Sequence, residues 1–600
     1  MILVTLILAL AGGCQEPEVP AAASAPPSTF TGPQFLRGTV GSMAYLANYG
    51  PLLVSGFGVV VLPEPTGSGE VPPFLRQHLI NLMRKRGVGS VKYRDILKRT
   101  PEQMLADPRT AIVEVYGLIP PGSVPGSRFD LLVKAYRQTQ TTSLAGGWLY
   151  TLTLTIDGTN PALPFRKPVA EGGGGIYIDP FREGDGDKTR DEHLREAVVI
   201  AGGKAASPQQ IRLLLNQPSF RRSRLISDRI NERFSRTDDR HLIAMPQNER
   251  VITIWIPPRW QGKSERLLAL ISCLYVQGGE GFELRKARQL VQVIRQVPEY
   301  TKDVVNTLRA LGRSVTPVLQ DHYEDADPNL QLAVLEAGSW LGDERAGQYL
   351  HGLSLHPEAA MRRRVAEVLV FLPRSIDGTR ALQALLNDSD RSVCLAAYES
   401  LAANYDPFID RFPIMDETNR LKLVIDRVPA GNSLIYVTHA SGVPRLVIFD
   451  RHMAFRTPMV ARLWDGRLML KASAADEPLL LFYQGKDHFE GRTYKLNPTV
   501  ATLAFMLAHR PSMEQPQEGL DLTYAEVIDA IYNLVDAGHI DADLQLDLSP
   551  LIQAISESEG KFDEPEIRPE FEPTTQTREV SDGIGSSTAQ SAVVVARSDF

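Results

Sequence analysis

The feature that most constrains the fold is a helical pattern that recurs three times between about residues 280 and 405. In each copy apolar side chains return every third or fourth position, which places them on one face of a helix. The copies follow one another at a period of about 30–33 residues. Their apolar positions are Leu330, Ala333, Val334, Ala337 and Leu341, then Met361, Val365, Val368, Leu369 and Leu372, then Val393, Ala396, Ala397 and Leu401. Each such helix alone leaves an apolar face exposed, so the segment has to fold as a stack of helices.

Shorter apolar helices follow the first two copies, around Tyr349 to Leu353 and around Leu382 to Leu386. A helix and a shorter partner that repeat at this spacing resemble HEAT repeats, in which helix pairs stack side by side. The resemblance implies that residues 280–405 form an α-solenoid with a surface suited to docking another protein.

The regions on either side of the repeats have a different pattern. Residues 38–276 mix expected strands with an amphipathic helix from Phe74 to Arg86; the strands are expected at Leu52 to Leu62, Ala111 to Leu118, Leu131 to Ala135 and Trp148 to Ile156. Residues 410–510 predict a small β-rich domain, and residues 520–548 predict a helix followed by a strand. The expected fold class is therefore multidomain α+β, with strand-rich domains, an inserted α-solenoid segment and a small C-terminal β-rich domain.

Length and charge limit the classes of function. A chain of 600 residues exceeds what one hydrophobic core serves, so about three to five folding units are expected. Lys and Arg number 64 against 71 Asp and Glu, and this mildly acidic balance argues against a nucleic-acid partner. Beyond Cys14 the cysteines are Cys273 and Cys394, each within an apolar helical pattern. Buried thiols are expected, without a disulfide framework or a cysteine metal site.

The N-terminal residues predict export from the cytoplasm. Residues 1–14 combine an apolar run with the small residues Ala11 to Gly13, and end at Cys14. This order resembles a bacterial lipobox, which implies that Cys14 is the lipid attachment site; the alternative is an ordinary cleaved signal with an incidental cysteine. Residues 15–37, rich in Pro, Ala and Ser, predict a tether, and residues 558–600 predict a disordered acidic tail.

Motifs that suggest chemistry all fail at a required position. The run Gly172 to Gly175 lacks the Lys-Ser or Lys-Thr of a phosphate-binding loop and predicts a flexible turn before a strand at 176–178. The alternating residues Asp185 to Asp191 lack the glycine and glutamate of a calcium loop. His351 and His356 are five apart and do not share a helical face. The sequence therefore predicts no catalytic, cofactor-binding or metal site, and a protein that is not an enzyme.

Four separated blocks, in order along the chain, resemble the flagellar basal-body P-ring family. The first combines a strand from Ser55 to Val60, a glycine turn and the helix from Phe74 to Val88. The second runs from Ala111 to Val115 and on to Gly147, and the third joins a strand at Leu213 to a helix that ends at Phe234. The fourth is the helix and strand between Ala525 and Leu544. The resemblance implies P-ring-like domains into which the helical repeats are inserted at an exposed loop.

The resemblance also implies a function. It predicts a structural subunit of a homo-oligomeric ring in the periplasm, which surrounds the flagellar rod as a bushing, joins the outer-membrane ring proteins and contacts peptidoglycan. Ring closure needs only one pair of complementary surfaces, so no cofactor is expected. The membrane would be reached only through a lipid on Cys14. The alternative is a periplasmic HEAT-repeat lipoprotein that acts as an envelope assembly or docking adaptor.

Overall fold

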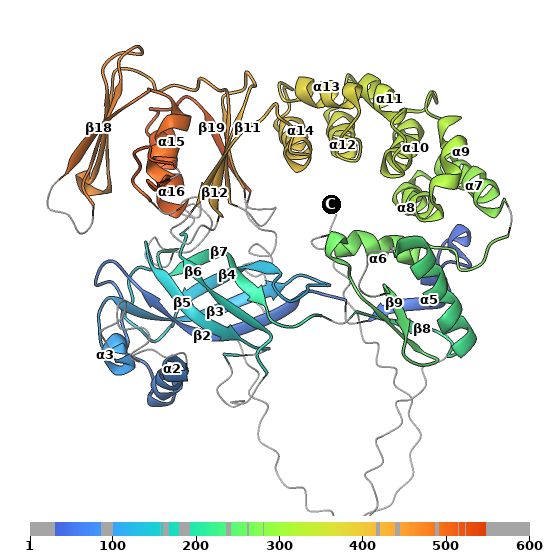
Figure 1. Cartoon of the computed structure of the whole chain (residues 1–600), viewed down its shortest axis with the longest axis horizontal. Coiled ribbons are helices and arrows are strands. Elements are labelled where there is room, and N and C mark those ends of the chain that lie inside the picture. The colour runs from blue at the N-terminus through green and yellow to red at the C-terminus, as the bar shows by residue number, and fades with distance from the viewer. Residues whose placement is uncertain are drawn as a thin grey trace, which may run out of the picture. The chain divides into compact units, whose positions relative to one another are not determined.

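The computed structural model describes residues 30–547 except for 48, 86–99, 157, 160–166, 179–192, 210, 236–241, 261–262, 280, 416–420, 439–443, 486–490, 514 and 523. Figure 1 shows four kinds of structure in this part of the chain: a barrel, a small sheet with helices, a run of helices and a pair of sheets around two helices. None of the described helices is long and apolar enough to span a bilayer. Cys14 and residues 558–600 lie outside the described residues, so the anchor and tail stay predictions.

A closed six-stranded barrel forms the first body. Its order is β2-β3-β4-β7-β6-β5, and every neighbouring pair is antiparallel. The strands are β2 (Leu52–Val61), β3 (Thr110–Ile119), β4 (Arg128–Ala135), β5 (Trp148–Leu154), β6 (Ala170–Gly175) and β7 (Glu196–Ala205). The four strands expected in this region are confirmed. Alternate residues point inward and are fully buried, among them Val113, Val115 and Val133, because the pleat sends successive side chains to opposite faces.

Glycines make room inside the barrel for one aromatic ring. A Cβ atom at Gly117 would lie 2.6 Å from the ring of Phe129, and one at Gly203 would lie 2.4 Å from it. A Cβ at Gly172 would lie 2.6 Å from the Leu131 side chain. The expectation that Gly172 to Gly175 form a turn is therefore wrong: the run is part of β6, and at Gly172 and Gly174 a larger residue would collide with Leu131 and Val199.

Two helices cover the outside of the barrel. They are α2 (Pro73–Lys85), which confirms the helix expected there, and α3 (Pro101–Leu105). Thr100 caps α3: its side-chain oxygen accepts a hydrogen bond from the backbone N–H of Gln103, and the Gln103 side-chain Oε1 accepts one from the backbone N–H of Thr100. Their apolar faces bury Leu75, Leu79 and Leu105 against outward-facing barrel residues.

The second body is a four-stranded antiparallel sheet in the order β1-β8-β10-β9. Its strands are β1 (Ala44–Ala47), β8 (Ile211–Leu215), β9 (Ala244–Pro246) and β10 (Val251–Ile254). Since β1 precedes the barrel and β8 follows it, the barrel is an insertion within this unit. The helices α5 (Phe220–Phe234) and α6 (Ser264–Ser272) pack with one face of the sheet into a shared core.

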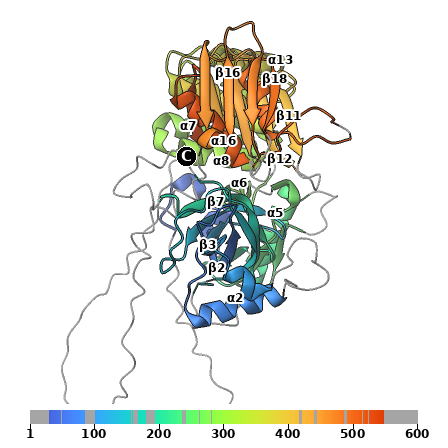
Figure 2. The ribbon, with the colours of Figure 1, turned by 90° about the vertical axis from the view of Figure 1, so that its left-hand side faces the viewer.

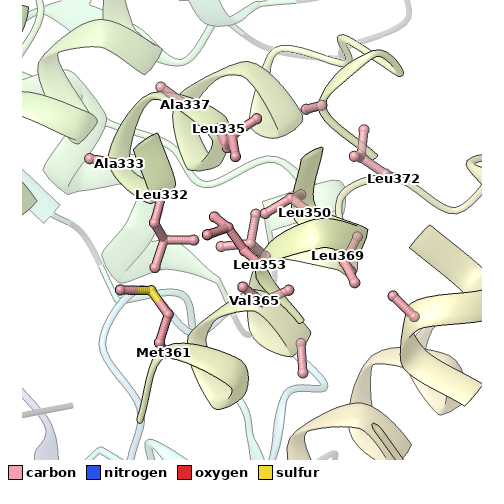
Figure 3. Close-up of a cluster of buried hydrophobic side chains, with 14 of the residues drawn as sticks. Leu332, Ala333, Leu335, Ala337, Leu350, Leu353, Met361, Val365, Leu369 and Leu372 are labelled. Atoms are coloured by element: carbon pink, nitrogen blue, oxygen red, sulfur yellow. The ribbon is translucent and has the colours of Figure 1, made fainter. Parts of the chain in front are cut away.

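A run of helices begins at residue 282. It comprises α7 (Phe282–Gln296), α8 (Thr301–Leu311), α9 (Thr316–Gln320), α10 (Pro328–Trp340), α11 (Ala346–Leu353), α12 (Ala359–Leu369), α13 (Ile376–Leu385) and α14 (Arg391–Ala403). The expected helices at α10 to α14 are confirmed. Figure 1 shows α8, α10, α12 and α14 in one row and α9, α11 and α13 in a second, and contacts follow these rows. Leu350 and Leu353 of α11 lie among Leu335, Val365 and Leu369 of the neighbouring helices (Figure 3).

Two sheets enclose two helices in the C-terminal region. The five-stranded sheet has the order β11-β12-β14-β13-β19, and the four-stranded antiparallel sheet the order β15-β16-β17-β18 (Figures 1 and 2). The strands are β11 (Asp410–Met415), β12 (Leu421–Val428), β13 (Leu434–Thr438), β14 (Arg445–Phe449), β15 (Met459–Leu463), β16 (Leu468–Ala472), β17 (Leu479–Tyr483), β18 (Arg492–Leu496) and β19 (Asp543–Asp547). The helices are α15 (Val500–Ala508) and α16 (Tyr524–Asp536). Because β19 pairs with β13, the segments expected at 410–510 and 520–548 share one sheet.

Candidate assembly surface and junctions

One face of the four-stranded sheet carries apolar side chains that no helix covers. Tyr45 of β1 lies beside Leu214 of β8, which lies beside Val251 of β10. Met245 of β9 continues the same face next to Thr253, which is itself buried and is not counted in the open face. Tyr45 is 50% exposed and Met245 is 46% exposed, whereas the opposite face of the same strands is buried under α5 and α6. We call these residues the open face; an uncovered apolar row of this kind is a candidate protein interface.

The small sheet and the helical run meet at a cluster built around Trp340 of α10. Trp260, from the 3-10 turn before α6, lies 6.0 Å from the Trp340 ring, and Phe371, after α12, lies 4.9 Å from it at 77°. The guanidinium of Arg266 on α6 lies 5.5 Å from the Trp340 ring centre and 5.2 Å from that of Phe371. The guanidinium of Arg309 on α8 lies 5.2 Å from the Trp340 ring centre and 5.7 Å from that of Phe371. Two cations thus flank one aromatic pair, a favourable arrangement for partly desolvated charges.

A buried carboxylate holds the arginines of this cluster. Glu336 on α10 accepts hydrogen bonds from Arg309 at 2.7 Å and from Arg364 of α12 at 2.6 and 3.2 Å. Burial lowers the pKa of Arg309 to about 10, and the charge of Glu336 opposes that shift. Arg309 therefore stays protonated near neutral pH. We call Trp260, Arg266, Arg309, Glu336, Trp340, Arg364 and Phe371 the tryptophan junction.

Further contacts tie the same two bodies together. Arg233 of α5 donates hydrogen bonds of 2.9 Å to the carbonyl oxygens of both Arg309 and Ala310, which end α8. Backbone carbonyls at a helix C-terminus lack partners within the helix, so the partly buried Arg233 cation stabilises them. Tyr275 packs edge-on against Phe282 with ring centres 5.2 Å apart. The helical run is therefore docked on the small sheet by polar and apolar contacts.

A second junction joins α14 to the five-stranded sheet. Asp426 of β12 is fully buried and accepts hydrogen bonds from Tyr398 of α14 at 2.7 Å and from Arg411 of β11 at 3.1 Å. Burial raises the pKa of Tyr398 far above its usual range, so this phenol remains a donor. The apolar residues of the helices and of this sheet also form one continuous core. The helical run thus shares its core with the C-terminal sheet.

The residues weighed for chemistry remain dispersed. Cys273 and Cys394 are both buried and free, as expected, and burial raises the pKa of each thiol to about 11. His351 lies on α11, whereas His356 lies in the turn after it. Residues 185 and 187 fall outside the described part of the chain. Among the described residues no group of three or more His, Cys, Asp or Glu side chains is arranged to hold a metal ion.

Sequence reasoning did not identify either junction. Arg309, Glu336 and Arg364 are charged residues spread over three helices, and charged positions on helices ordinarily face solvent. The signal available in the sequence was indirect: Arg309 and Glu336 each sit inside an otherwise apolar stretch. The open face was equally hidden, because its exposure depends on which side of the sheet the helices occupy.

Comparison with known proteins gives a match for part of the chain. Residues 42–282 match the family model for the flagellar P-ring protein. The flagellar P-ring protein of Geotalea uraniireducens (strain Rf4) is 26% identical over 230 residues, which are 37% of this chain and 56% of the relative. The flagellar P-ring protein of Geobacter sulfurreducens (strain ATCC 51573 / DSM 12127 / PCA) is 26% identical over 231 residues, which are likewise 37% of this chain and 56% of the relative. The chain spans about half the length of the curated relatives it matches.

The boundaries of the match coincide with boundaries in the structure. Residue 42 lies just before β1, and residue 282 is the first residue of α7. The matched segment therefore holds the barrel and the small sheet with α5 and α6. The first three sequence blocks fall within it, and the fourth, between Ala525 and Leu544, falls outside, so that part of the resemblance stays a prediction.

Proposed function

We propose that this chain is a structural subunit of the flagellar basal-body P ring and that many copies assemble into a closed ring around the rod, since residues 42–282 match the family model for the flagellar P-ring protein. The observation that carries the proposal is the match itself, which covers two complete bodies of the structure and stops where the helical run begins. The role is structural and not enzymatic: the function resides in the shape of the subunit and in its contacts.

Assembly of a ring needs one surface on each subunit that fits a different surface on the next subunit. The open face supports this role, because it lies in the matched segment and presents Tyr45 and Met245 to solvent. Apolar side chains exposed on a sheet become stabilising when a neighbouring subunit covers them. We propose that the open face is one half of the subunit contact.

The proposed setting follows from the family. The ring would lie in the periplasm as part of the basal body, contact the rod and the outer-membrane ring proteins, and sit near peptidoglycan. A lipid on Cys14 would add a membrane anchor. Neither a cofactor nor a nucleic-acid partner enters the proposal.

A second candidate function has its own supporting observation. The helices α7 to α14 lie outside the family match and stack in two rows. Their rows support an α-solenoid of HEAT-like repeats, a type of structure that offers an extended binding surface. On this proposal the chain is a periplasmic adaptor, and the P-ring-like bodies serve as its scaffold.

Imaging of basal bodies distinguishes the two candidates. Purified basal bodies from cells that carry a labelled copy of the chain should show the label in a ring around the rod. Met245→Glu should reduce ring incorporation, because it places a charge on the proposed contact. Val460→Glu is the matched control, since Val460 is 71% exposed on β15, outside the matched segment. Label absent from the rod-associated rings would overturn the P-ring proposal and leave the adaptor.

A further inference from the structure

A cavity of about 490 Å³ lies in the C-terminal region, outside the family match. One wall is the end of the five-stranded sheet, where Phe412 and Arg411 belong to the outermost strand β11 and Arg427 to its neighbour β12. The opposite wall is α15 with Phe505, and the rim carries Gln515 and Gln517. The volume is that of a site for a small molecule or for a few residues of a peptide.

Local contacts fix the walls of this cavity in place. The guanidinium of Arg427 lies 4.8 Å from the centre of the Phe412 ring. On the other side Phe505 stacks on His509 with ring centres 4.7 Å apart and planes at 17°. Lys422 of β12 donates hydrogen bonds to the Ala508 carbonyl at 3.0 Å and to Asp521 at 2.9 Å, which fastens the end of α15 to the sheet. The site is therefore formed before any ligand arrives.

The charge around the cavity is positive. Arg411 pairs with Asp426 at 3.1 Å, while Arg427 and Arg451 share the single carboxylate of Asp410 at 3.2 and 2.9 Å. Three guanidinium groups thus face two carboxylates, and none of the described residues that line the cavity is acidic. The Arg427 side chain remains 34% exposed, so part of it is accessible to a ligand.

From these features we propose that the cavity binds an acidic peptide, with a carboxylate against Arg427 and an adjoining aromatic or aliphatic side chain between Phe412 and Phe505. A planar guanidinium matches the two oxygens of a carboxylate. The aromatic walls accept an apolar side chain, and the glutamine amides at the rim can bond peptide groups. The chain would thereby hold a segment of a partner protein through its C-terminal domain.

The test measures binding of defined peptides to the full chain by titration calorimetry. The probe is acetyl-Ala-Glu-Phe-Ala-amide, and its neutral counterpart carries Gln in place of Glu. We expect saturable binding of the acidic peptide and at least about tenfold weaker binding of the neutral one, because the charge-assisted hydrogen bond is lost. Inorganic phosphate should compete poorly. Equal binding of both peptides, no saturable binding, or phosphate competing as well as the peptide overturns the proposal.

Two variants locate the binding in this cavity. Arg427→Gln removes the charge, and Ala501→Leu fills the space from α15 while leaving both arginines in place. Each should weaken binding of the acidic peptide at least about tenfold. Arg456→Gln is the control, since Arg456 pairs with Asp541 on the exposed surface of the same region. Because Arg427→Gln also loses the contact to Asp410, Ala501→Leu decides the matter if the first variant unfolds: undiminished binding by it places the peptide elsewhere.

Discussion

Glu399 is a carboxyl group in an unfavourable position. It lies on α14 toward the five-stranded sheet, and its Oε1 atom is buried without a hydrogen-bond partner among the described residues. Burial raises the pKa of Glu399 above its ordinary value of 4.5; the Arg445 charge opposes this shift, and the Asp547 charge adds to it. Desolvation of the charged form prevails.

This pKa shift predicts a pH dependence of stability. The folded chain holds the Glu399 proton more tightly than the unfolded chain, so above pH 4.5 the unfolded state binds fewer protons and stability falls as the pH rises through the folded pKa. Glu399→Gln should therefore match the parent chain below pH 4.5 and exceed its free energy of unfolding above the folded pKa. Urea denaturation at several pH values measures this difference, with the exposed Glu344→Gln as control. A constant difference at all pH values would contradict the assignment.

For single residues, the sequence allows the burial of some side chains to be predicted but not that of others. Cys273 and Cys394 were predictably buried, because apolar neighbours at helical spacing surround each of them. Arg309 was not, since its burial depends on Glu336, which is distant in sequence and reaches it only when α8 and α10 stack. Long-range charge pairs leave no local pattern.

Among the elements, strand β6 depends most directly on glycine. Its residues Gly172 to Gly175 form a barrel strand although glycine disfavours strands, and at Gly172 and Gly174 the side chains of Leu131 and Val199 need the space. The Phe129 ring likewise occupies the space that a side chain at Gly117 or Gly203 would need. A sequence pattern that counts turn residues cannot predict this, since the requirement comes from neighbours across the barrel.

A single added methyl group tests this packing. Gly203→Ala places a Cβ 2.4 Å from the Phe129 ring and should cost about 1–3 kcal/mol in the free energy of unfolding, as overpacked cores do. Gly175→Ala is the matched control, because its Cβ meets Trp148 at an ordinary 3.6 Å. Chemical denaturation measures both variants. Equal stability of the two would contradict the tight packing, whereas recovery of Gly203→Ala by Phe129→Leu would support it.

Elements with a strong period were the predictable ones. The helices α10, α12 and α14 follow from apolar residues at helical spacing, and β2 and β3 from long apolar runs. The strands β11, β15 and β18 carry alternating or mostly polar residues and offer little apolar signal. Helix α15 is apolar on nearly every side because sheets enclose it, so no amphipathic pattern marks it.

On the scale of the whole molecule, the tryptophan junction links the family-matched part to the helical run. Trp340 belongs to the edge of both hydrophobic cores, that of the small sheet and that of the helices. Displacement of the helical run from the small sheet would separate the Trp260 ring and the Arg266 guanidinium from Trp340, and would break the hydrogen bonds that Arg233 donates to the end of α8. A partner bound to the helices would pull directly on the family-matched part of the chain.

Removal of one carboxylate tests the buried ion pair of the tryptophan junction, which joins α10 to α8 and α12 within the helical run. Glu336→Gln leaves Arg309, which is 7% exposed, without its counter-charge and should lower the free energy of unfolding by about 3 kcal/mol. Glu367→Gln is the control, because Glu367 bonds the same Arg364 at 2.7 Å but in a more exposed pair, worth less than about 1 kcal/mol. Urea denaturation followed by tryptophan fluorescence measures both. Similar losses for the two variants would show that the buried pair contributes no more to stability than the exposed one.

The placement of β1 ahead of the barrel also dictates an order of events as the chain is made. Ala44 pairs with Leu215, so the first strand emerges from the ribosome long before its partner exists. The barrel can close in the interval, and the sheet around it can be completed only afterwards. Until then β1 is an unpaired edge that any passing strand could capture. If synthesis stops before β8, the barrel would therefore be closed while β1 stays unpaired and prone to pair with a strand of another chain.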